Sequence, residues 1–339
     1  MAQWAAGARR SKTEDGRPKT DLAWTMNFEA RSSKLEARPS PHLTQPSPLL
    51  QGAERGQHGR PRAAASALSP QRGEGRGEGC EPSPQVPTGR RVNFLGCPLD
   101  LLTSAQLLEE LRQAIDTRSG PRVIQFVNAN KVAQVYELPD MGPIMWRAHY
   151  VLADGQPMLP LARMLGIHVP ERIDGIGLMG KLLALADLHR YSVFLLGAKQ
   201  PVVEACVDRI RREFPNLRIA GFRNGYFSPD QAAEVVAQVR AARPDILFLG
   251  MGSPMKERFA DRYATELGAT VIQGVGGSFD VWAGLVKRAP VWLQRLGLEW
   301  LYRVLQEPKR MAWRYARTNA ICLWVFARAL AKRWTGRRV

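Results

Sequence analysis

The stretch that organises this chain is residues 274–315, GVGGSFDVWAGLVKRAPVWLQRLGLEWLYRVLQEPKRMAWRY. It opens with a glycine turn directly after an apolar run, which is the usual build of a loop that faces phosphate groups. It continues into a segment rich in Trp, Leu and Arg, and further Arg residues follow Pro308. One segment therefore joins a predicted ligand-binding loop to a predicted membrane-facing surface.

Upstream of this stretch, short apolar runs alternate with helical patterns. The predicted strands occupy residues 122–127, 149–153, 191–197, 217–221, 245–250 and 270–274. These strands are apolar on both faces, which indicates a parallel sheet covered by helices on both sides. We therefore predict an α/β protein with a Rossmann-like parallel sheet flanked by helices.

Polar and glycine residues follow several of the predicted strands. Ligands of such sheets bind beyond the carboxyl ends of the strands, so these residues are predicted to converge on one crevice. They are Asn128, Asn130, Asp154, Gly197, Gly252 and Gly276. Asp154 is the best single candidate for chemistry, because a carboxylate there would accept the proton of an attacking hydroxyl. The competing interpretation is a helix cap for the segment after Pro157.

Several common site motifs are missing or incomplete. Residues 175–180 fit GxGxxG in letters, but no strand precedes them, as a dinucleotide site requires. The sequence holds neither a P-loop nor an Asp-x-Asp motif, and no His/Cys/acid cluster has metal spacing. The four cysteines form no CxxC pair, which favours free thiols. We predict no metal and no cofactor.

The positive charge of the chain is concentrated at its two ends. Residues 1–91 carry a net charge of +6, residues 92–284 of zero, and residues 285–339 of +11. A basic end interleaved with aromatic and apolar residues suits an anionic membrane surface, with nucleic acid as the competing partner. The sequence predicts an amphipathic helix at 291–306 and a second helix from Pro308. The apolar run 320–327 is too short to span a bilayer, which takes about 20 residues.

The chain is expected to have three parts. Residues 1–91 are rich in Pro, Gly, Arg and Ser, and we predict a disordered low-complexity arm, with a basic regulatory arm as the alternative. Residues 92–287 form the α/β core, and residues 288–339 form a basic helical appendage that binds membrane. Because residues 1–30 hold no continuous apolar segment, we expect a cytoplasmic protein, peripheral on the inner face of the cell membrane.

From about Asn93 to Tyr315 the chain resembles the WecG/TagA/CpsF glycosyltransferases, glycosyltransferase family 26. The resemblance is carried by short blocks spread along the core and by one dense block in the tail. The core blocks are 128–130, 153–155, Arg172 with Gly175, 196–197, 225–227, 244–246, 252–254 with Glu257, and 276–280. The tail block comprises 283–284, 288–290, 297–303, 307–308 and Arg310.

The resemblance implies an inverting, metal-independent transfer of a sugar from a UDP-sugar to a polyprenyl-diphosphate-linked saccharide. It implies that Asp154 is the catalytic base. It places Asn128, Asn130 and Arg172 in the substrate pocket and the tail arginines, Arg303, Arg310 and Arg314, at the lipid diphosphate. We also predict that the substrates are bound by Gly197, Gly252, Lys256, Glu257, Gly276 and Gly277. The family usually has Thr at position 128 and Gln at position 256. These departures leave the donor sugar open between N-acetylmannosaminyl, glucosyl and related groups.

Two other function classes fit parts of the sequence. One is a nucleotide-sugar or dinucleotide-dependent oxidoreductase, which a nicotinamide-cofactor binding test would reveal. The other is a basic membrane- or nucleic-acid-binding module without catalysis, which salt-sensitive nucleic-acid affinity would favour. The sequence leaves the oligomeric state open.

Overall fold

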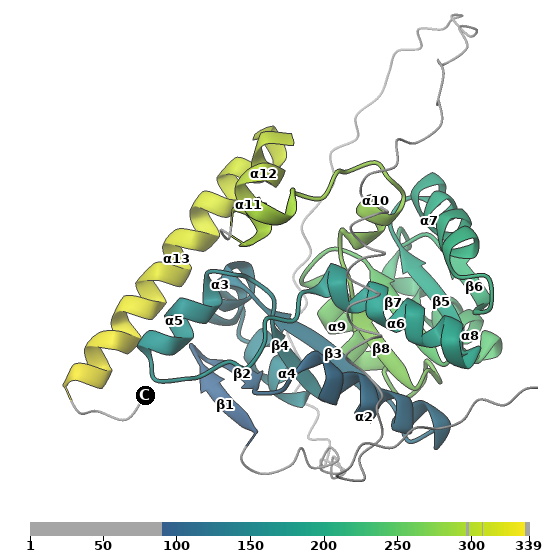
Figure 1. Ribbon diagram of the computed structural model, residues 1–339, viewed down its shortest axis with the longest axis horizontal. Coiled ribbons are helices and arrows are strands. Elements are labelled where there is room, and N and C mark those ends of the chain that lie inside the picture. Colours follow the sequence, from purple (N-terminus) through teal and green to yellow (C-terminus); the bar gives the residue numbers. More distant parts are fainter. Residues whose placement is uncertain (1–89, 296–297, 307, 336–339) are drawn as a thin grey trace, which may run out of the picture.

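The computed structural model describes residues 90–335 of the chain, except 296–297 and 307. Its centre is a six-stranded sheet with the strand order β4-β3-β8-β7-β5-β6, and every neighbouring pair is parallel (Figure 1). The strands are β3 (Arg122–Val127), β4 (Tyr150–Ala153), β5 (Ser192–Gly197), β6 (Arg218–Arg223), β7 (Ile246–Gly250) and β8 (Val271–Gly274). Each predicted strand is present within two residues of its expected bounds. The predicted α/β class and Rossmann-like sheet are confirmed.

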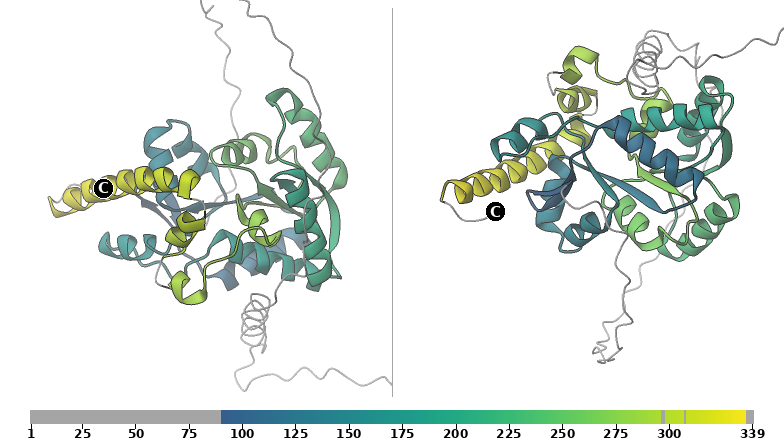
Figure 2. Two further views of the ribbon diagram at one scale, coloured as in Figure 1. Left: turned by 90° about the horizontal axis from the view of Figure 1, so that it is seen from above. Right: turned by 60° about the horizontal axis from the view of Figure 1, so that its bottom comes forward.

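Helices cover both faces of the sheet (Figure 2). One face packs against α2 (Ser104–Asp116), α6 (Gly175–His189), α7 (Gln200–Glu213) and α10 (Ser278–Trp282). The other packs against α3 (Ala129–Glu137), α4 (Met141–Arg147), α5 (Met158–Met164), α8 (Ala232–Ala242) and α9 (Met255–Tyr263), with the short η1 (Pro229–Gln231) leading into α8. Both faces of the inner strands are therefore apolar, which explains the near-continuous apolar runs in the sequence.

Helix α2 begins where the sequence predicted. Thr103 accepts a hydrogen bond from the backbone N–H of Gln106, and the Gln106 side chain accepts one from the backbone N–H of Thr103. This reciprocal capping box satisfies two backbone donors that a helix start leaves without partners. The predicted Thr103 cap is confirmed.

The segment before α2 holds a hairpin that the sequence did not reveal. β1 (Arg91–Phe94) and β2 (Cys97–Asp100) pair antiparallel through a tight turn at Leu95 and Gly96, whose φ angles are 55° and 85°. A turn with two positive φ angles matches the twist of a hairpin, but Leu is an unusual residue in it. Sequence rules look for Asn-Gly or Asp-Gly at this place, so Leu-Gly gave no signal.

The C-terminal region is helical, but its first part differs from the expectation. Instead of one helix over 291–306, the structure has α11 (Val291–Arg295) and α12 (Glu299–Gln306). The sequence between them includes Gly297, and glycine costs about 1 kcal/mol inside a helix relative to alanine. Pro308 begins α13 (Pro308–Trp334), as expected from the fixed φ of proline at a helix start.

Helix α13 lies along α3 and α5 and is packed into the core rather than free of it (Figures 1 and 2). Cys322 and Phe326 are buried in the apolar cluster on the α3 face of the sheet. Arg317 binds Glu137 at 2.7 Å, and the ring of Trp324 meets that of Tyr136 edge-on at 5.2 Å. The apolar run 320–327 thus serves the core along one side of the helix, while Leu323 and Trp324 remain exposed.

Across the described part of the chain, every helix is too short or too polar to cross a bilayer. Large apolar side chains are nevertheless exposed in the C-terminal region, namely Leu285, Trp292, Leu301, Leu305, Trp313, Leu323, Trp324 and Trp334. The predicted N-terminal arm, residues 1–91, lies outside the described residues up to position 89. Three cysteines of the described part, Cys97, Cys206 and Cys322, are buried free thiols, and Cys80 lies outside that part.

Candidate active site

The helix arrangement predicts openings at the carboxyl edge of the sheet on both sides of β8, and one of them lies between β3 and β8. The helix after β3, α3, packs on one face of the sheet, and the helix after β8, α10, packs on the other. Connections that leave neighbouring strands toward opposite faces open a gap at the strand ends, where ligands of such sheets bind. Asn128 follows β3, and the Gly276-Gly277 turn follows β8, so two of the predicted site segments border this gap.

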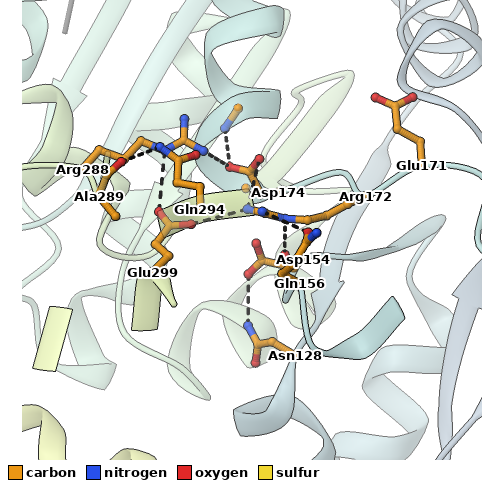
Figure 3. Close-up of polar contacts among 12 residues, drawn as sticks. Asn128, Asp154, Gln156, Glu171, Arg172, Asp174, Arg288, Ala289, Gln294 and Glu299 are labelled. Carbon is orange, nitrogen blue, oxygen red and sulfur yellow. Dashed lines mark hydrogen bonds and ion pairs between the residues drawn. The ribbon is translucent and has the colours of Figure 1, made fainter. Parts of the chain in front are cut away.

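Asp154 follows β4 and is held by its neighbour strand (Figure 3). Its backbone N–H donates to the carbonyl of Val127 at 3.0 Å. Its carboxylate oxygen Oδ2 accepts a hydrogen bond from Asn128 Nδ2 at 3.1 Å. Asn128 is itself fixed, because its Oδ1 caps α3 by accepting from the backbone N–H of Lys131 at 3.1 Å. The helix cap therefore sets which end of the Asn128 amide points at Asp154.

Asp154 does not cap the helix that follows it. Helix α5 begins at Met158 with Pro157 in the cap position, and no side chain provides a capping hydrogen bond there. The competing interpretation from the sequence thus lacks the contact that it requires. The Asp154 side chain instead faces Asn128 and the Arg172 region (Figure 3).

Arg172 ties together the groups around Asp154. Its Nε donates to the backbone carbonyl of Asp154 at 2.9 Å, and its Nη1 donates to Gln156 Oε1 at 3.3 Å. Its Nη2 lies 3.6 Å from Asp174 Oδ1 and 3.4 Å from Glu299 Oε2. The guanidinium thus links the end of β4 to α12 of the C-terminal region.

Arg288 makes a second bridge to the same two carboxylates. Its Nη2 lies 2.8 Å from Asp174 Oδ2, and its Nε lies 3.6 Å from Glu299 Oε1. Asp174 also caps α6, since its side chain accepts from the backbone N–H of Gly177 at 2.9 Å. We refer to Asp154, Arg172, Asp174, Arg288 and Glu299 as the tail-linked network. Its charges alternate, so each arginine is shared between two carboxylates (Figure 3).

Three members of this network were not among the predicted site residues. Arg288 and Glu299 fall in the tail block of the resemblance, but nothing in their spacing showed that Glu299 meets Arg172 or that Arg288 meets Asp174. Asp174 directly precedes the GxGxxG letters at 175–180, and a residue of its type before a helix is an N-cap signal. That signal would have located the start of α6, though not the contact with the arginines. The segment before it is not a strand, as predicted.

The surroundings of Asp154 favour its protonated form. Burial raises the pKa of Asp154 above its ordinary value, and the carboxylates of Asp174 and Glu299 act in the same direction. The hydrogen bond from Asn128 and the charge of Arg172 oppose this shift without cancelling it. A carboxylate with a raised pKa holds a proton more tightly than an ordinary one, which suits a group that must accept a proton during a reaction.

A second polar cluster lies on the other side of Asn128, at the ends of β7 and β8. Lys131 Nζ donates to Glu257 Oε1 at 2.6 Å, to Ser253 Oγ at 2.7 Å and to Gln134 Oε1 at 2.9 Å. Lys256 Nζ also binds Glu257 Oε1. We call Lys131, Ser253, Lys256 and Glu257 the core lysine cluster. Lys131 and Glu257 are 3% and 0% exposed, so Glu257 is a buried partner of the lysines rather than a surface of the crevice.

The predicted glycines play different structural parts. A Cβ on Gly197 would lie 2.4 Å from the backbone of Gly250, so close packing of β5 against β7 requires glycine there. Gly276 has a φ of 53°, in the left-handed region. Gly252 has no atom within 4 Å of its Cβ position, and Gly277 is exposed, so these two border open space.

The remaining predicted residues lie on either side of the crevice. Asn130 is half-buried in the first turn of α3. Arg314 is exposed on α13, with its guanidinium 5.3 Å from the ring centre of Tyr315. The side chains of Arg303 and Arg310 lie outside the described residues, so their predicted role is not placed. No group of three His, Cys, Asp or Glu side chains within residues 90–295, 298–306 and 308–335 has the arrangement of a metal site.

Comparison with known proteins identifies relatives over most of this region. Residues 92–336 match the model of the glycosyl transferase WecG/TagA/CpsF family. A relative from Bacillus subtilis (strain 168) is 35% identical over 207 residues, covering 61% of this chain and 78% of the relative. One from Staphylococcus aureus (strain MW2) is 32% identical over 245 residues, covering 72% and 94%. Both relatives are named N-acetylglucosaminyldiphosphoundecaprenol N-acetyl-beta-D-mannosaminyltransferase.

The fold, the crevice and these relatives together define the class of the protein, which is a glycosyltransferase. The chain belongs to the WecG/TagA/CpsF family, because the family model covers its whole α/β core and its C-terminal helices. The resemblance seen in the sequence is thereby confirmed.

Proposed function

We propose that this protein transfers a sugar from a UDP-sugar to a saccharide linked to polyprenyl diphosphate, with inversion at the anomeric carbon and without a metal ion. The two relatives are named for transfer to an N-acetylglucosaminyl diphosphoundecaprenol, which supports the acceptor class. The observation that carries the proposal is Asp154, a half-buried carboxylate with a raised pKa at the edge of the sheet crevice.

The chemistry follows from the placement of Asp154. Its carboxylate accepts the proton of the acceptor hydroxyl as the hydroxyl oxygen attacks the anomeric carbon of the donor. The bond between that carbon and the phosphate oxygen breaks, and its electron pair leaves with the nucleotide diphosphate. Asn128 holds the carboxylate by one oxygen, which leaves the other oxygen for the incoming hydroxyl. Arg172 fixes the backbone of Asp154 and thereby its position relative to the donor.

The donor sugar is proposed only as a class. Asn128 and Lys256 stand where the family usually has Thr and Gln, and both border the crevice. N-acetylmannosaminyl, glucosyl and related groups are therefore all candidates. Incubation with a panel of radiolabelled nucleotide sugars and a synthetic N-acetylglucosamine diphosphate lipid tests the proposal. We expect one donor to label the lipid. If the protein binds nucleotide sugars but no donor in the panel labels the lipid, the proposal is contradicted.

We further propose that α11, α12 and α13 rest on the cytoplasmic face of an anionic membrane. The region from residue 285 carries a net charge of +11, and each basic residue near such a surface contributes on the order of 1 kcal/mol. Trp292, Trp313 and Trp334 are 61%, 77% and 83% exposed, and indole rings favour the headgroup level. This surface would bring the lipid-linked acceptor to the crevice.

Vesicle binding tests this membrane proposal. Truncation of the tail would remove Cys322 and Phe326 from the core, so substitution of exposed residues is the sharper test. The double variant Trp313→Ser/Trp334→Ser should bind phosphatidylglycerol vesicles about tenfold more weakly, since two apolar rings are lost. Leu188→Ser, which removes an exposed apolar side chain of α6, serves as the control and should bind as the unaltered protein does. Equal binding by all three proteins would overturn the proposal.

A further inference from the structure

The core lysine cluster carries more positive than negative charge. It holds two lysines and one glutamate, and the ammonium groups of both lysines bind Glu257 Oε1. The pKa of Glu257 is lowered to about 2, because Lys256 and Lys131 outweigh the effect of its burial, so Glu257 is ionised at neutral pH. One positive charge is therefore left without a carboxylate inside the cluster. A buried surplus charge is costly unless a ligand or solvent compensates it.

The surplus belongs to Lys256 rather than to Lys131. Lys131 has three N–H donors, and three acceptors surround it, on Gln134, Ser253 and Glu257. Its hydrogen-bonding capacity is filled. Lys256 also has three donors, but within the described residues its hydrogen bond goes to Glu257 alone. Its side chain is 13% exposed, against 3% for Lys131, so Lys256 is the cation that an external group can reach.

The helix starts around Lys256 add to this positive potential. Lys131 lies in the first turn of α3, and Lys256 lies in the first turn of α9, each a helix of nine residues. The start of a helix carries a partial positive charge, and proteins usually place acidic residues there. Two lysines at two neighbouring helix starts are the reverse of that preference. An anion stabilises such an arrangement, and Glu257 supplies just one.

The Lys256 side chain lies over the glycine turn that follows β8. Its Cε is 3.2 Å from the position a Cβ would take on Gly274 and 3.9 Å from that position on Gly276. Any side chain at Gly274 would therefore crowd the lysine. Gly252, on the facing loop after β7, borders open space. The end of the Lys256 side chain thus lies at the carboxyl ends of β7 and β8, near the glycine loops that follow these two strands.

The position of Lys256 relative to Asp154 suits the two ends of a displacement reaction. Asp154 follows β4, and the turn under Lys256 follows β8, with β3 between them. Two strand positions correspond to about 10 Å. Inversion requires the attacking oxygen and the leaving oxygen on opposite sides of the anomeric carbon. A base at one end of this span and a cation at the other match that requirement.

We propose that Lys256 binds the diphosphate of the nucleotide donor and stabilises the negative charge that this group gains on leaving. Lys131 and Glu257 act as positioning residues, which hold the Lys256 ammonium over the glycine turn. When the bond from the anomeric carbon to the phosphate oxygen breaks, the diphosphate gains one negative charge. Lys256 meets that charge with hydrogen bonds and transfers no proton. This inference rests on the proposed function and names the group that takes the place of a metal ion in it.

Calorimetric titration with UDP and with uridine separates this inference from the proposed function. The unaltered protein should bind UDP more tightly than uridine. Lys256→Gln should weaken UDP binding about 10- to 100-fold, the usual range for a hydrogen bond to a charged group, and leave uridine binding unchanged. Lys256→Arg, which keeps the charge, should retain most of the UDP affinity. The control Arg258→Gln removes one positive charge from the exposed side of the same helix and should change neither affinity.

The outcomes separate the role of Lys256 from the proposed function. If the unaltered protein shows no preference for UDP over uridine, the nucleotide-diphosphate donor of the proposed function is in doubt. If the unaltered protein prefers UDP and the Lys256→Gln variant prefers it equally, only the proposed role of Lys256 is overturned. Unchanged uridine binding also reports that the variant is folded.

A labelling experiment on the unaltered protein tests the inference without a variant. Amine acetylation followed by mass spectrometry should modify Lys256 in the free protein and not when UDP is bound. Uridine should give no protection, and the exposed Lys199 serves as an internal reference in both samples. Equal labelling of Lys256 with UDP and with uridine would overturn the inference.

Discussion

The two polar clusters at the carboxyl edge of the sheet differ in the parts of the chain that supply them. The tail-linked network combines Asp154, Arg172 and Asp174 of the core with Arg288 and Glu299 of the C-terminal region. The core lysine cluster comes entirely from α3, α9 and the loop before α9. A movement of α12 would change the contacts of the tail-linked network, whereas the core lysine cluster would keep its place on the sheet. The surroundings of the proposed base thus depend on the tail, and those of the proposed leaving-group cation do not.

The clusters also differ in burial. The carboxylates and guanidinium groups of the network outside Asp154 have side chains that are 17–25% exposed. The charged groups of the lysine cluster are 0–13% exposed. Ion pairs near solvent contribute little to stability, whereas the loss of one partner from a buried pair is strongly destabilising. Substitutions should therefore affect mainly catalysis in the first cluster and mainly folding at Lys131 and Glu257, the fully buried pair of the second.

The largest effect is expected for Asp154→Asn. The amide keeps the shape of the side chain but accepts no proton, so turnover should fall by about 10²–10⁴-fold while the affinity for UDP is retained. Steady-state kinetics together with calorimetric titration measures both quantities. Gln156→Asn, a change at a neighbouring side chain that touches Arg172 rather than the acceptor, provides the comparison. Near-normal turnover of a folded Asp154→Asn protein would remove Asp154 from the mechanism.

The same variant should be more stable than the unaltered protein at neutral pH. The folded-state pKa of Asp154 is raised above its ordinary value of 3.8, so the folded chain holds this proton more tightly than the unfolded chain. Ionisation of Asp154 thus lowers the stability of the fold as the pH rises above that ordinary value. Asp154→Asn removes this cost, and its gain in melting temperature should shrink as the pH is lowered toward 3.8. An equal gain at pH 4 and pH 7.5 would contradict this account.

A large effect on stability is expected for Glu257→Gln. The neutral side chain leaves the buried Lys131 and the partly buried Lys256 without a carboxylate, which should cost about 3–5 kcal/mol of unfolding free energy. Urea titration measures this loss, and Glu266→Gln, at an exposed position after α9, is the control. The pKa of Glu257 is lowered to about 2, so its stabilising effect is present above its ordinary value of 4.5 and is lost as the pH falls through about 2. A loss of unfolding free energy below about 1 kcal/mol at pH 7 would show that the ion pair of Glu257 with Lys131 does not hold the cluster together.

The sequence predicted the sheet better than it predicted the clusters. Strand runs such as 191–197 and 245–250 are apolar because both of their faces are covered, and that pattern is local. The same logic placed Asn128 and Asp154 near each other, since parallel strands end at one edge, and their side chains do meet. Both conclusions needed only the order of residues along the chain.

The contacts between distant segments carried no local signal. Glu299 meets Arg172 and Arg288 meets Asp174 across more than one hundred residues, and Lys131 meets Glu257 across a similar separation. In a helical pattern an arginine or a lysine usually indicates a solvated side chain. The sequence therefore gives no sign that such a residue has a distant partner. The packing of α13 on α3 was hidden in the same way, because Cys322 and Phe326 belong to an apolar run that equally suits a membrane surface.

A smaller effect is expected for Glu299→Gln, which tests the link between the network and the tail. The ion pairs of Glu299 with Arg172 and Arg288 span 3.4 Å and 3.6 Å and are partly exposed, so the loss of stability should be below about 1 kcal/mol. The charge of Glu299 also raises the pKa of Asp154. Its removal should shift the acidic limb of the pH–rate profile to lower pH. Glu204→Gln, on the exposed side of α7, should leave the profile in place. An unchanged profile in Glu299→Gln would show that the tail does not act on Asp154.

The smallest effect is expected for the removal of divalent cations. If Lys256 meets the charge of the leaving diphosphate, the fixed lysine cluster already supplies what a metal ion would supply. Turnover should then be the same in excess EDTA and in EDTA saturated with Mg²⁺. The Lys256→Gln variant sharpens the comparison, because without the lysine a bound Mg²⁺ has a charge to neutralise, and turnover should rise when Mg²⁺ is added. Loss of turnover of the unaltered protein in EDTA, restored by Mg²⁺ or Mn²⁺, would mean that the cluster does not act alone and that a cation completes the site.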